Sequence, residues 1–164
     1  MAIGGDFIQW VENVPYSHCA ILIEANGIAI VYESLWPKSR KVSFDKWLEK
    51  YEIVQMYSFD VPENKVKPLV EDLESMVSRF YSVPQLVLIG LSLLNDWFER
   101  ISRAWILNHR KGLICTELVA IILSSYFPTQ FSESLDRVGL KDCELALDHL
   151  KELERRNDGS LWLS

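Results

Sequence analysis

A cysteine at the predicted start of an apolar helix is the residue whose position best suits it for chemistry. Cys115 follows a polar loop, 108–112, and precedes the apolar run 118–123, and Phe127-Pro128 ends the pattern. Free N–H groups and the positive end of the helix dipole meet at a helix N-terminus, and both favour a thiolate over a thiol. Cysteine is also among the most buried residue types, so the same position is typical of a packed core. A chemical role for Cys115 therefore requires partner side chains from elsewhere in the chain.

A predicted β-hairpin near the N-terminus supplies candidate partners. The segments 18–24 and 28–33 are rich in β-forming residues, and they flank Asn26-Gly27, a pair typical of two-residue hairpin turns. If these two residues form the centre of the turn, Ala25 pairs with Ile28. Every further cross-strand pair then follows by counting outward along the two strands.

That count places His18 and Glu33 close together. Ala20 pairs with Glu33, and His18 lies one diagonal step away on the same face of the sheet. Diagonal neighbours are about 7–8 Å apart at Cα, which lets a glutamate hydrogen-bond a ring nitrogen. Glu24 shares the face but lies about 20 Å from His18 along the strand. Glu33 is therefore the predicted partner of His18, and Glu24 is expected at the rim.

A cysteine, a histidine and a carboxylate are the parts that nucleophilic acyl transfer requires. In this interpretation Cys115 is the nucleophile, His18 takes its proton, and Glu33 orients the imidazole. The arrangement requires the helix to pack its first turn against the start of the His18 strand. The alternative is structural: His18 as a satisfied, half-buried histidine and Glu33 as a solvated strand end.

The remaining pattern predicts an α+β fold with an antiparallel sheet packed against the helix that carries Cys115. Strands come first and helices follow, without a repeat or a linker, which predicts a single domain over 1–164. Beyond the hairpin and the Cys115 helix, the expected elements are short strands at 7–10 and 51–61, a short helix at 46–50, and helices at 64–81, 86–105 and 141–155.

Composition and charge exclude several classes of protein. The net charge of −6 gives no footprint for nucleic acid. The longest apolar run, 86–94, is too short to span a bilayer, so no integral membrane span is expected. The N-terminus lacks the pattern of a signal peptide, and three cysteines do not make a disulfide framework, which together predict reduced thiols and a cytoplasmic location. Release on lysis would leave no mark in the sequence.

A metal site is the main rival explanation for the cysteines and histidines. Cys19 adjoins His18, and Cys143 lies six residues before His149. Neither spacing supplies a chelate of four ligands, so no metal and no cofactor are expected. Cys19 and Cys143 are predicted to be core residues.

Four short segments together resemble a known family of enzymes. They are Gly-Asp-Phe-Ile (5–8), Tyr-Ser-His-Cys-Ala-Ile-Leu-Ile (16–23), Val-Tyr-Glu-Ser (31–34) and Ile-Cys-Thr-Glu-Leu-Val (114–119). The sequence resembles the circularly permuted NlpC-like papain-fold proteins, nearest to the YiiX-like branch and more distantly lecithin:retinol acyltransferase. In ordinary papain-like enzymes the cysteine helix comes first, so the order His, Glu, Cys marks the permutation.

The resemblance implies a thiol hydrolase with Cys115 as nucleophile, His18 as base and Glu33 as orienting residue. It implies an acyl-enzyme formed from an amide, ester or thioester, and cell-wall peptide, protein isopeptide and lipid acyl groups all fit as substrates. Two alternatives stay open. One is a lipid-directed acyltransferase that docks on a membrane surface through 86–94, and the other is a non-catalytic binding module on the same scaffold.

Overall fold

The structure is a computed structural model, and it describes residues 9, 13–83, 112–127, 131, 135 and 138–156. Within these residues the fold is α+β, with one antiparallel sheet of three strands in the order β1-β2-β3. The strands come first and the helices follow, as the sequence predicts. The elements are β1 (Ile21–Ala25), β2 (Ile28–Glu33), β3 (Arg40–Ser43), α2 (Phe44–Leu48), α3 (Glu63–Met76), α6 (Cys115–Tyr126) and α7 (Leu140–Arg156).

The hairpin has the predicted turn and register. Asn26 and Gly27 both have positive φ, 53° and 73°, as a type I′ turn requires. Ala25 pairs with Ile28, and the ladder continues with the same count to the last pair of the hairpin. However, β1 begins at 21 rather than at 18, so His18 lies on the chain that leads into the strand.

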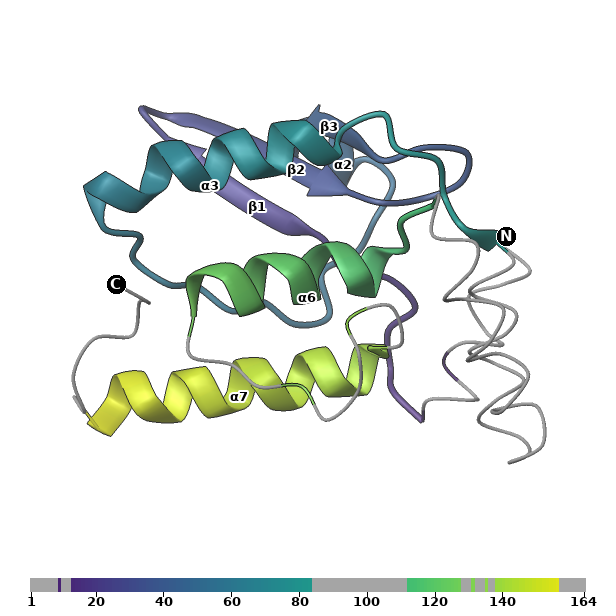
Figure 1. The fold of residues 1–164 in the computed structure, drawn as a ribbon. Coiled ribbons are helices and arrows are strands. Elements are labelled where there is room, and N and C mark those ends of the chain that lie inside the picture. The colour runs from purple at the N-terminus through teal and green to yellow at the C-terminus, as the bar shows by residue number, and fades with distance from the viewer. Residues whose placement is uncertain are drawn as a thin grey trace.

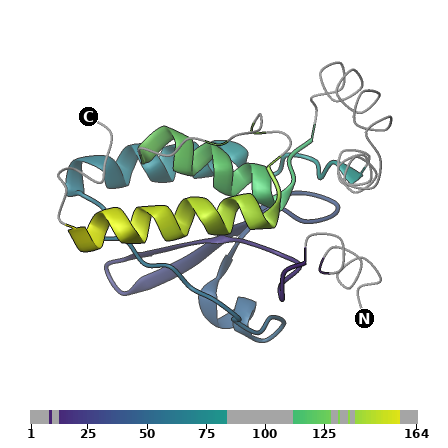
Figure 2. The ribbon, with the colours of Figure 1, turned by 90° about the horizontal axis from the view of Figure 1, so that it is seen from below.

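The two faces of the sheet are covered differently. Side chains of the face that includes Tyr32 pack into the main core with the larger helices, and α2 lies across the sheet from them (Figure 2). Residues that pair across strands share a face, so Glu33, one position beyond Tyr32, faces the α2 side together with Arg40. The sheet thus separates α2 from α3, α6 and α7. Glu33 is the last residue of β2, so it lies at the end of the sheet.

Helix α6 lies in the centre of the helical layer (Figure 1). It packs against both α3 and α7, and Ala120 in its middle is fully buried. The helices around 115 and 141–155 therefore form where the apolar pattern predicts them. The core consists mainly of Tyr32 from β2, Leu69 and Leu73 from α3, Leu118, Val119, Ile122 and Leu123 from α6, and Cys143 and Leu150 from α7.

One predicted strand is wrong, and one predicted helix ends earlier than expected. No strand forms over 51–61, because the edge of β2 is taken by β3, a short strand with two basic residues that the sequence pattern did not indicate. Phe59 and Val61 pack against the core from a segment without regular secondary structure instead. Helix α3 ends at Met76 rather than at 81, and Ser78 has a φ of 70°, which helical residues do not adopt.

The remaining predicted elements differ at their boundaries or lie outside the described residues. The short helix covers Phe44–Leu48 instead of 46–50. The predicted helix 86–105, with its apolar run 86–94, lies outside the described residues, and of the predicted strand 7–10 only Gln9 is described, in a helical conformation. No helix in the described part of the chain is long and apolar enough to cross a bilayer.

Candidate active site

Three segments that are distant in sequence meet at one end of the molecule. The hairpin turn lies at the opposite end, so the chain entering β1, the end of β2 and the start of α6 come together (Figure 1). Ser34, directly after β2, is fully buried and donates its hydroxyl hydrogen bond to the carbonyl of Leu113 at 2.6 Å. This bond fixes the entry to α6 beside the end of β2.

A short ladder of backbone contacts also fixes the path of the chain into α6. Phe80 forms isolated bridges with Lys38 on one side and Gly112 on the other, and the N–H of Leu113 donates to the carbonyl of Phe80 at 2.8 Å. A Cβ atom on Gly112 would lie 2.5 Å from the Cβ of Ser82. Glycine is therefore required at 112 for this close approach.

His18 and Glu33 are brought together, as the register predicted. Nε2 of His18 lies 3.0 Å from Oε2 of Glu33, in hydrogen-bonding distance. The Glu33 side chain is fully buried, and the His18 side chain is 20% exposed. Because Glu33 contacts Nε2, Nδ1 is the ring nitrogen that remains for another partner.

Glu33 has two further partners that the sequence did not predict. Arg40 contacts Oε1 through Nε at 2.8 Å and through Nη2 at 2.7 Å. Trp47 donates its indole N–H to Oε2 at 3.0 Å. Burial raises the pKa of the Glu33 carboxyl, but the hydrogen bonds from His18, Arg40 and Trp47 outweigh it, and the pKa lies below its usual value. Glu33 is therefore ionised at neutral pH.

Stacked aromatic rings cover this carboxylate–imidazole pair. The ring of Tyr51 lies parallel to that of His18, with centroids 5.8 Å apart and an interplanar angle of 24°. Tyr51 also stacks on Trp47, with centroids 4.8 Å apart. The imidazole is thus held in one plane by ring contacts as well as by its hydrogen bond.

Cys115 is the first residue of α6, and only 6% of it is exposed. Ile114 before it is extended, and no side chain caps the helix. A hydrogen bond from Cys19 lowers the pKa of the Cys115 thiol, burial opposes this effect, and the hydrogen bond and charge of His18 lower it further. The net result is a thiol pKa well below the usual value, which favours the thiolate.

The reciprocal effect appears at the imidazole. Burial lowers the pKa of His18, but hydrogen bonds to Cys115 and to Glu33, and the charges of both, raise it to about 9. Below that pH the imidazole is protonated, and the lowered pKa of the Cys115 thiol favours its thiolate. The two groups therefore form a thiolate–imidazolium pair.

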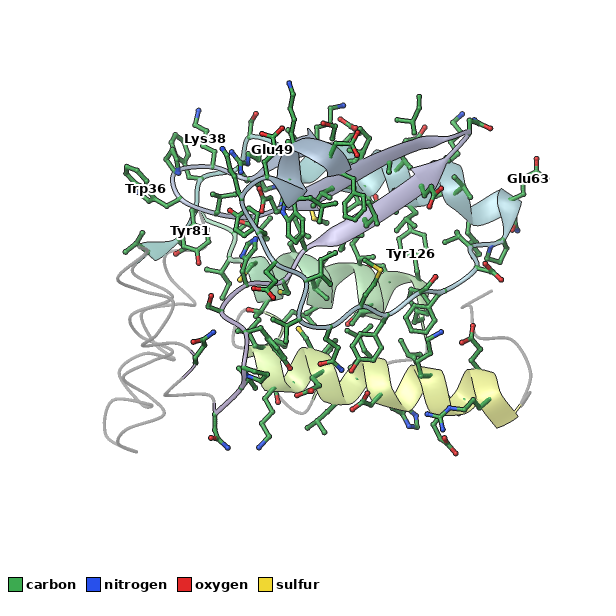
Figure 3. All side chains as sticks on the ribbon, turned by 180° about the vertical axis from the view of Figure 1, so that it is seen from behind. Trp36, Lys38, Glu49, Glu63, Tyr81 and Tyr126 are labelled. Atoms are coloured by element: carbon green, nitrogen blue, oxygen red, sulfur yellow. The ribbon has the colours of Figure 1, made fainter. Side chains whose placement is uncertain are left out.

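Cys19 and Tyr81 also border the thiolate. Hydrogen bonds to Cys115 and to Cys143, together with burial, raise the pKa of the Cys19 thiol. Burial and then the charges of Cys115 and Cys19 raise the pKa of the Tyr81 hydroxyl. Cys19 and Cys143 pack with the core, as predicted, but the contact of Cys19 with Cys115 was not predicted. Tyr81 follows Phe80 in the backbone ladder, which places it at this end of the molecule (Figure 3).

The other candidate groups lie apart from this site. Glu24 is exposed near the hairpin turn, as expected for a rim residue. Among the described residues, no group of three or more His, Cys, Asp or Glu side chains could hold a metal ion.

Comparison with known proteins adds no relative. No protein family, no curated protein and no solved structure matches the chain. The resemblance to the permuted papain-fold proteins therefore stays a prediction.

Proposed function

We propose that the protein is a thiol hydrolase that cleaves an amide, ester or thioester bond through an acyl-enzyme on Cys115. One observation carries the proposal: His18 bonds Glu33 through Nε2 at 3.0 Å while its ring also interacts with the Cys115 thiol. A nucleophile, a base and an orienting carboxylate in that order are the requirements of acyl transfer. The three groups come from α6, the chain before β1 and the end of β2.

In this mechanism the Cys115 thiolate attacks the carbonyl carbon of the substrate. The tetrahedral intermediate then collapses, the imidazolium of His18 gives its proton to the leaving nitrogen, oxygen or sulfur, and a thioester on Cys115 remains. His18, now neutral, takes a proton from water as the water attacks the thioester. The C–S bond then breaks, the acid is released, and the Cys115 thiolate is restored beside the imidazolium that holds the proton taken from water.

The start of α6 supplies the electrostatic part. The first N–H groups of a helix have no acceptor within the helix, and they point toward its N-terminal end. The N–H of Cys115 is in that position and would donate to the oxyanion as it forms. Removing one oxyanion donor costs about 3–4 kcal/mol in enzymes where it has been measured.

The order of the site residues supports a circularly permuted papain-like arrangement. His18 lies before β1 and Glu33 ends β2, and both precede the helix of Cys115. This matches the order that the sequence resemblance implies, whereas in ordinary papain-like enzymes the cysteine helix comes first. We therefore propose peptide or isopeptide bonds, including those of cell-wall peptide, as the first substrates to test.

Trapping of an acyl-enzyme tests this function. The protein is mixed with a p-nitrophenyl ester, a peptide anilide and a peptide thioester, quenched in acid, and its intact mass is measured. We expect an added acyl group on Cys115 with at least one donor and none in Cys115→Ala. Cys143→Ala, which removes another buried thiol, is the matched control and should still be acylated. An adduct that persists in Cys115→Ala would overturn the assignment.

A lipid acyl donor is a second candidate, because aromatic side chains are exposed near the site. Trp36 is 70% exposed and Phe80 is 63% exposed, and the Lys38 ammonium lies 4.8 Å from the centre of the Phe80 ring. Trp36 and Lys38 lie at the same end as Tyr81 (Figure 3). Tryptophan with lysine is typical of membrane interfaces. Co-sedimentation with phosphatidylcholine–phosphatidylglycerol vesicles, lost in Trp36→Ala, would favour this candidate, and a protein that stays in the supernatant would exclude it.

A further inference from the structure

The carboxylate of Glu33 is held from two sides, and only one side belongs to the proposed acyl-transfer relay. On that side His18 contacts Oε2. On the other side Arg40 contacts Oε1 through two nitrogens. We propose that Arg40 is a positioning residue that fixes the Glu33 carboxylate and offsets its charge, so that His18 is both oriented and able to release its proton. This inference rests on the proposed function of the same site.

The geometry divides the two oxygens of Glu33 between different tasks. Oε1 is contacted by Nε and Nη2 of Arg40 at 2.8 and 2.7 Å, whereas Oε2 lies 3.0 Å from both His18 Nε2 and Trp47 Nε1. Rotation of the carboxylate in either direction would break contacts on both oxygens. Because charge-assisted contacts of this kind are short and directional, Arg40 aims Oε2 at the imidazole.

The position of Arg40 follows from the sheet register. Arg40 pairs directly with Glu33 across β2 and β3, and paired residues lie on the same face. Its side chain is 39% exposed, so the guanidinium contacts the buried carboxylate while remaining partly hydrated. An arginine at this edge position can therefore reach Glu33 without becoming a buried charge of its own.

Charge is the second part of the role. The guanidinium is always protonated, so it offsets the charge of Glu33 whether or not His18 carries a proton. Without Arg40, the buried carboxylate would rely on the imidazolium for compensation. The other titratable groups facing this pair are Cys115 from α6, together with Tyr51 and Cys19. Of these, only Cys115 has a lowered pKa, and the negative charge of its thiolate acts on His18 in the same direction as that of Glu33.

Removal of the guanidinium should therefore make His18 hold its proton more strongly. Arg40 and His18 contact the same carboxylate, so the positive charge of Arg40 disfavours a second positive charge on His18. Loss of the Arg40 charge should therefore raise the pKa of His18 from about 9 by about one unit. An imidazolium that is a weaker acid protonates the leaving group more slowly. A residue that merely ties β3 to β2 would have no such effect on the imidazole.

The experiment measures the pKa of His18 by NMR titration of the histidine rings in the full-length protein. The chain has three histidines, so His18→Ala identifies the resonance. We expect the pKa to rise by about one unit in Arg40→Gln and to fall in Glu33→Gln, which removes the carboxylate charge. Arg40→Lys keeps the charge and should return the pKa to near the wild-type value. An unchanged pKa in Arg40→Gln would overturn the proposal.

The acylation rate, measured in parallel, separates this proposal from the proposed function. In Arg40→Lys we expect acylation about tenfold slower than in the wild type, because one ammonium replaces two directed nitrogen contacts. A wild-type rate in Arg40→Lys would show that the two-nitrogen contact does not position the Glu33 carboxylate. If Arg40→Gln does not fold, the rate of Arg40→Lys decides whether Arg40 is a positioning residue. A shifted pKa of His18 without any acylation would remove the hydrolase function and leave the Arg40–Glu33–His18 coupling in place.

Discussion

Two glutamates of the same hairpin have opposite environments. Glu33, at the end of β2, is fully buried and is contacted by His18, Arg40 and Trp47. Glu24, near the turn, lies on the same face of the same strand pair but is exposed to solvent. The residue type and the face are identical, so the difference comes from what lies beyond the strand ends. A carboxylate becomes part of a site where α2, β3 and the entry to α6 converge on it.

Two glycines, one at each end of the molecule, differ in the same way in what the backbone requires of them. Gly27 in the turn has a φ of 73°, and nothing lies within 4 Å of where its Cβ would be. Gly112, before α6, is required because Ser82 occupies the space of a Cβ. At the end of the molecule with the hairpin turn (the turn end), glycine is needed for its backbone conformation. At the end with Cys115 (the site end), glycine is needed because Ser82 approaches its Cα closely. Changes at the turn end should alter stability alone, and changes at the site end should alter the reaction.

The largest expected contrast is between Glu33→Gln and Glu24→Gln. Glutamine at 33 keeps the shape but removes the charge that stabilises the imidazolium, and loss of the corresponding charge in a serine protease triad reduces the rate by about 10⁴-fold. We expect acylation of Cys115 to fall by about 10³–10⁴-fold in Glu33→Gln and by less than about twofold in Glu24→Gln. Circular dichroism checks that both variants are folded. A crippled Glu24→Gln would mean that the site lies at the wrong end of the hairpin.

A smaller effect is expected when the close approach at the site end is blocked. In Gly112→Ala the new Cβ would meet Ser82 at 2.5 Å from Cβ and 2.9 Å from Cα, so backbone must move. Because the displaced segment leads directly into Cys115, we expect acylation to slow by about 10²-fold, the usual cost of a misplacement of about 1 Å. Ser82→Gly in the same chain should restore part of the rate. Full activity in Gly112→Ala would show that the path into α6 need not be fixed.

The smallest effect is expected at the turn end. Alanine at 27 must adopt a φ of 73°, which is strained for any residue with a Cβ. Gly27→Ala should therefore lower the free energy of unfolding by about 1 kcal/mol, measured by urea denaturation, and leave the acylation rate unchanged. A large loss of activity at full stability would mean that the turn end is coupled to the site.

Local signals in the sequence predicted the parts of the fold that form locally. Asn26-Gly27 fixed the register of the hairpin, and apolar periodicity located α6 and α7. The same register predicted the contact of His18 with Glu33. These predictions succeeded because a turn or a helix is determined by residues close to one another in the chain.

The parts that depend on packing between distant segments were missed. The alternating pattern of 51–61 suits a strand, but β3 occupies the edge of β2, and β3 has the charged residues Arg40 and Lys41, which are not typical of a buried strand. Arg40 and Trp47 contact Glu33 only because β3 and α2 fold back over it. The sequence held one signal of a partner for Glu33, the small basic cluster of Lys38, Arg40 and Lys41. Nothing in the sequence connected that cluster to Glu33.

The rate at which each cysteine is alkylated tests the central claim, a thiolate–imidazolium pair between Cys115 and His18, most directly. The pKa of Cys115 is lowered and that of Cys19 is raised, so at pH 6 the thiolate fraction of Cys115 exceeds that of Cys19. Iodoacetamide labelling at pH 6, followed by peptide mass spectrometry, should modify Cys115 at least about tenfold faster than Cys19 or Cys143. His18→Ala should slow the labelling of Cys115 and so reduce this preference, and the difference between wild type and variant should shrink as pH rises above about 9, where the imidazole loses its proton. Equal rates for the three cysteines at pH 6, or a preference for Cys115 that is undiminished in His18→Ala, would contradict the pair.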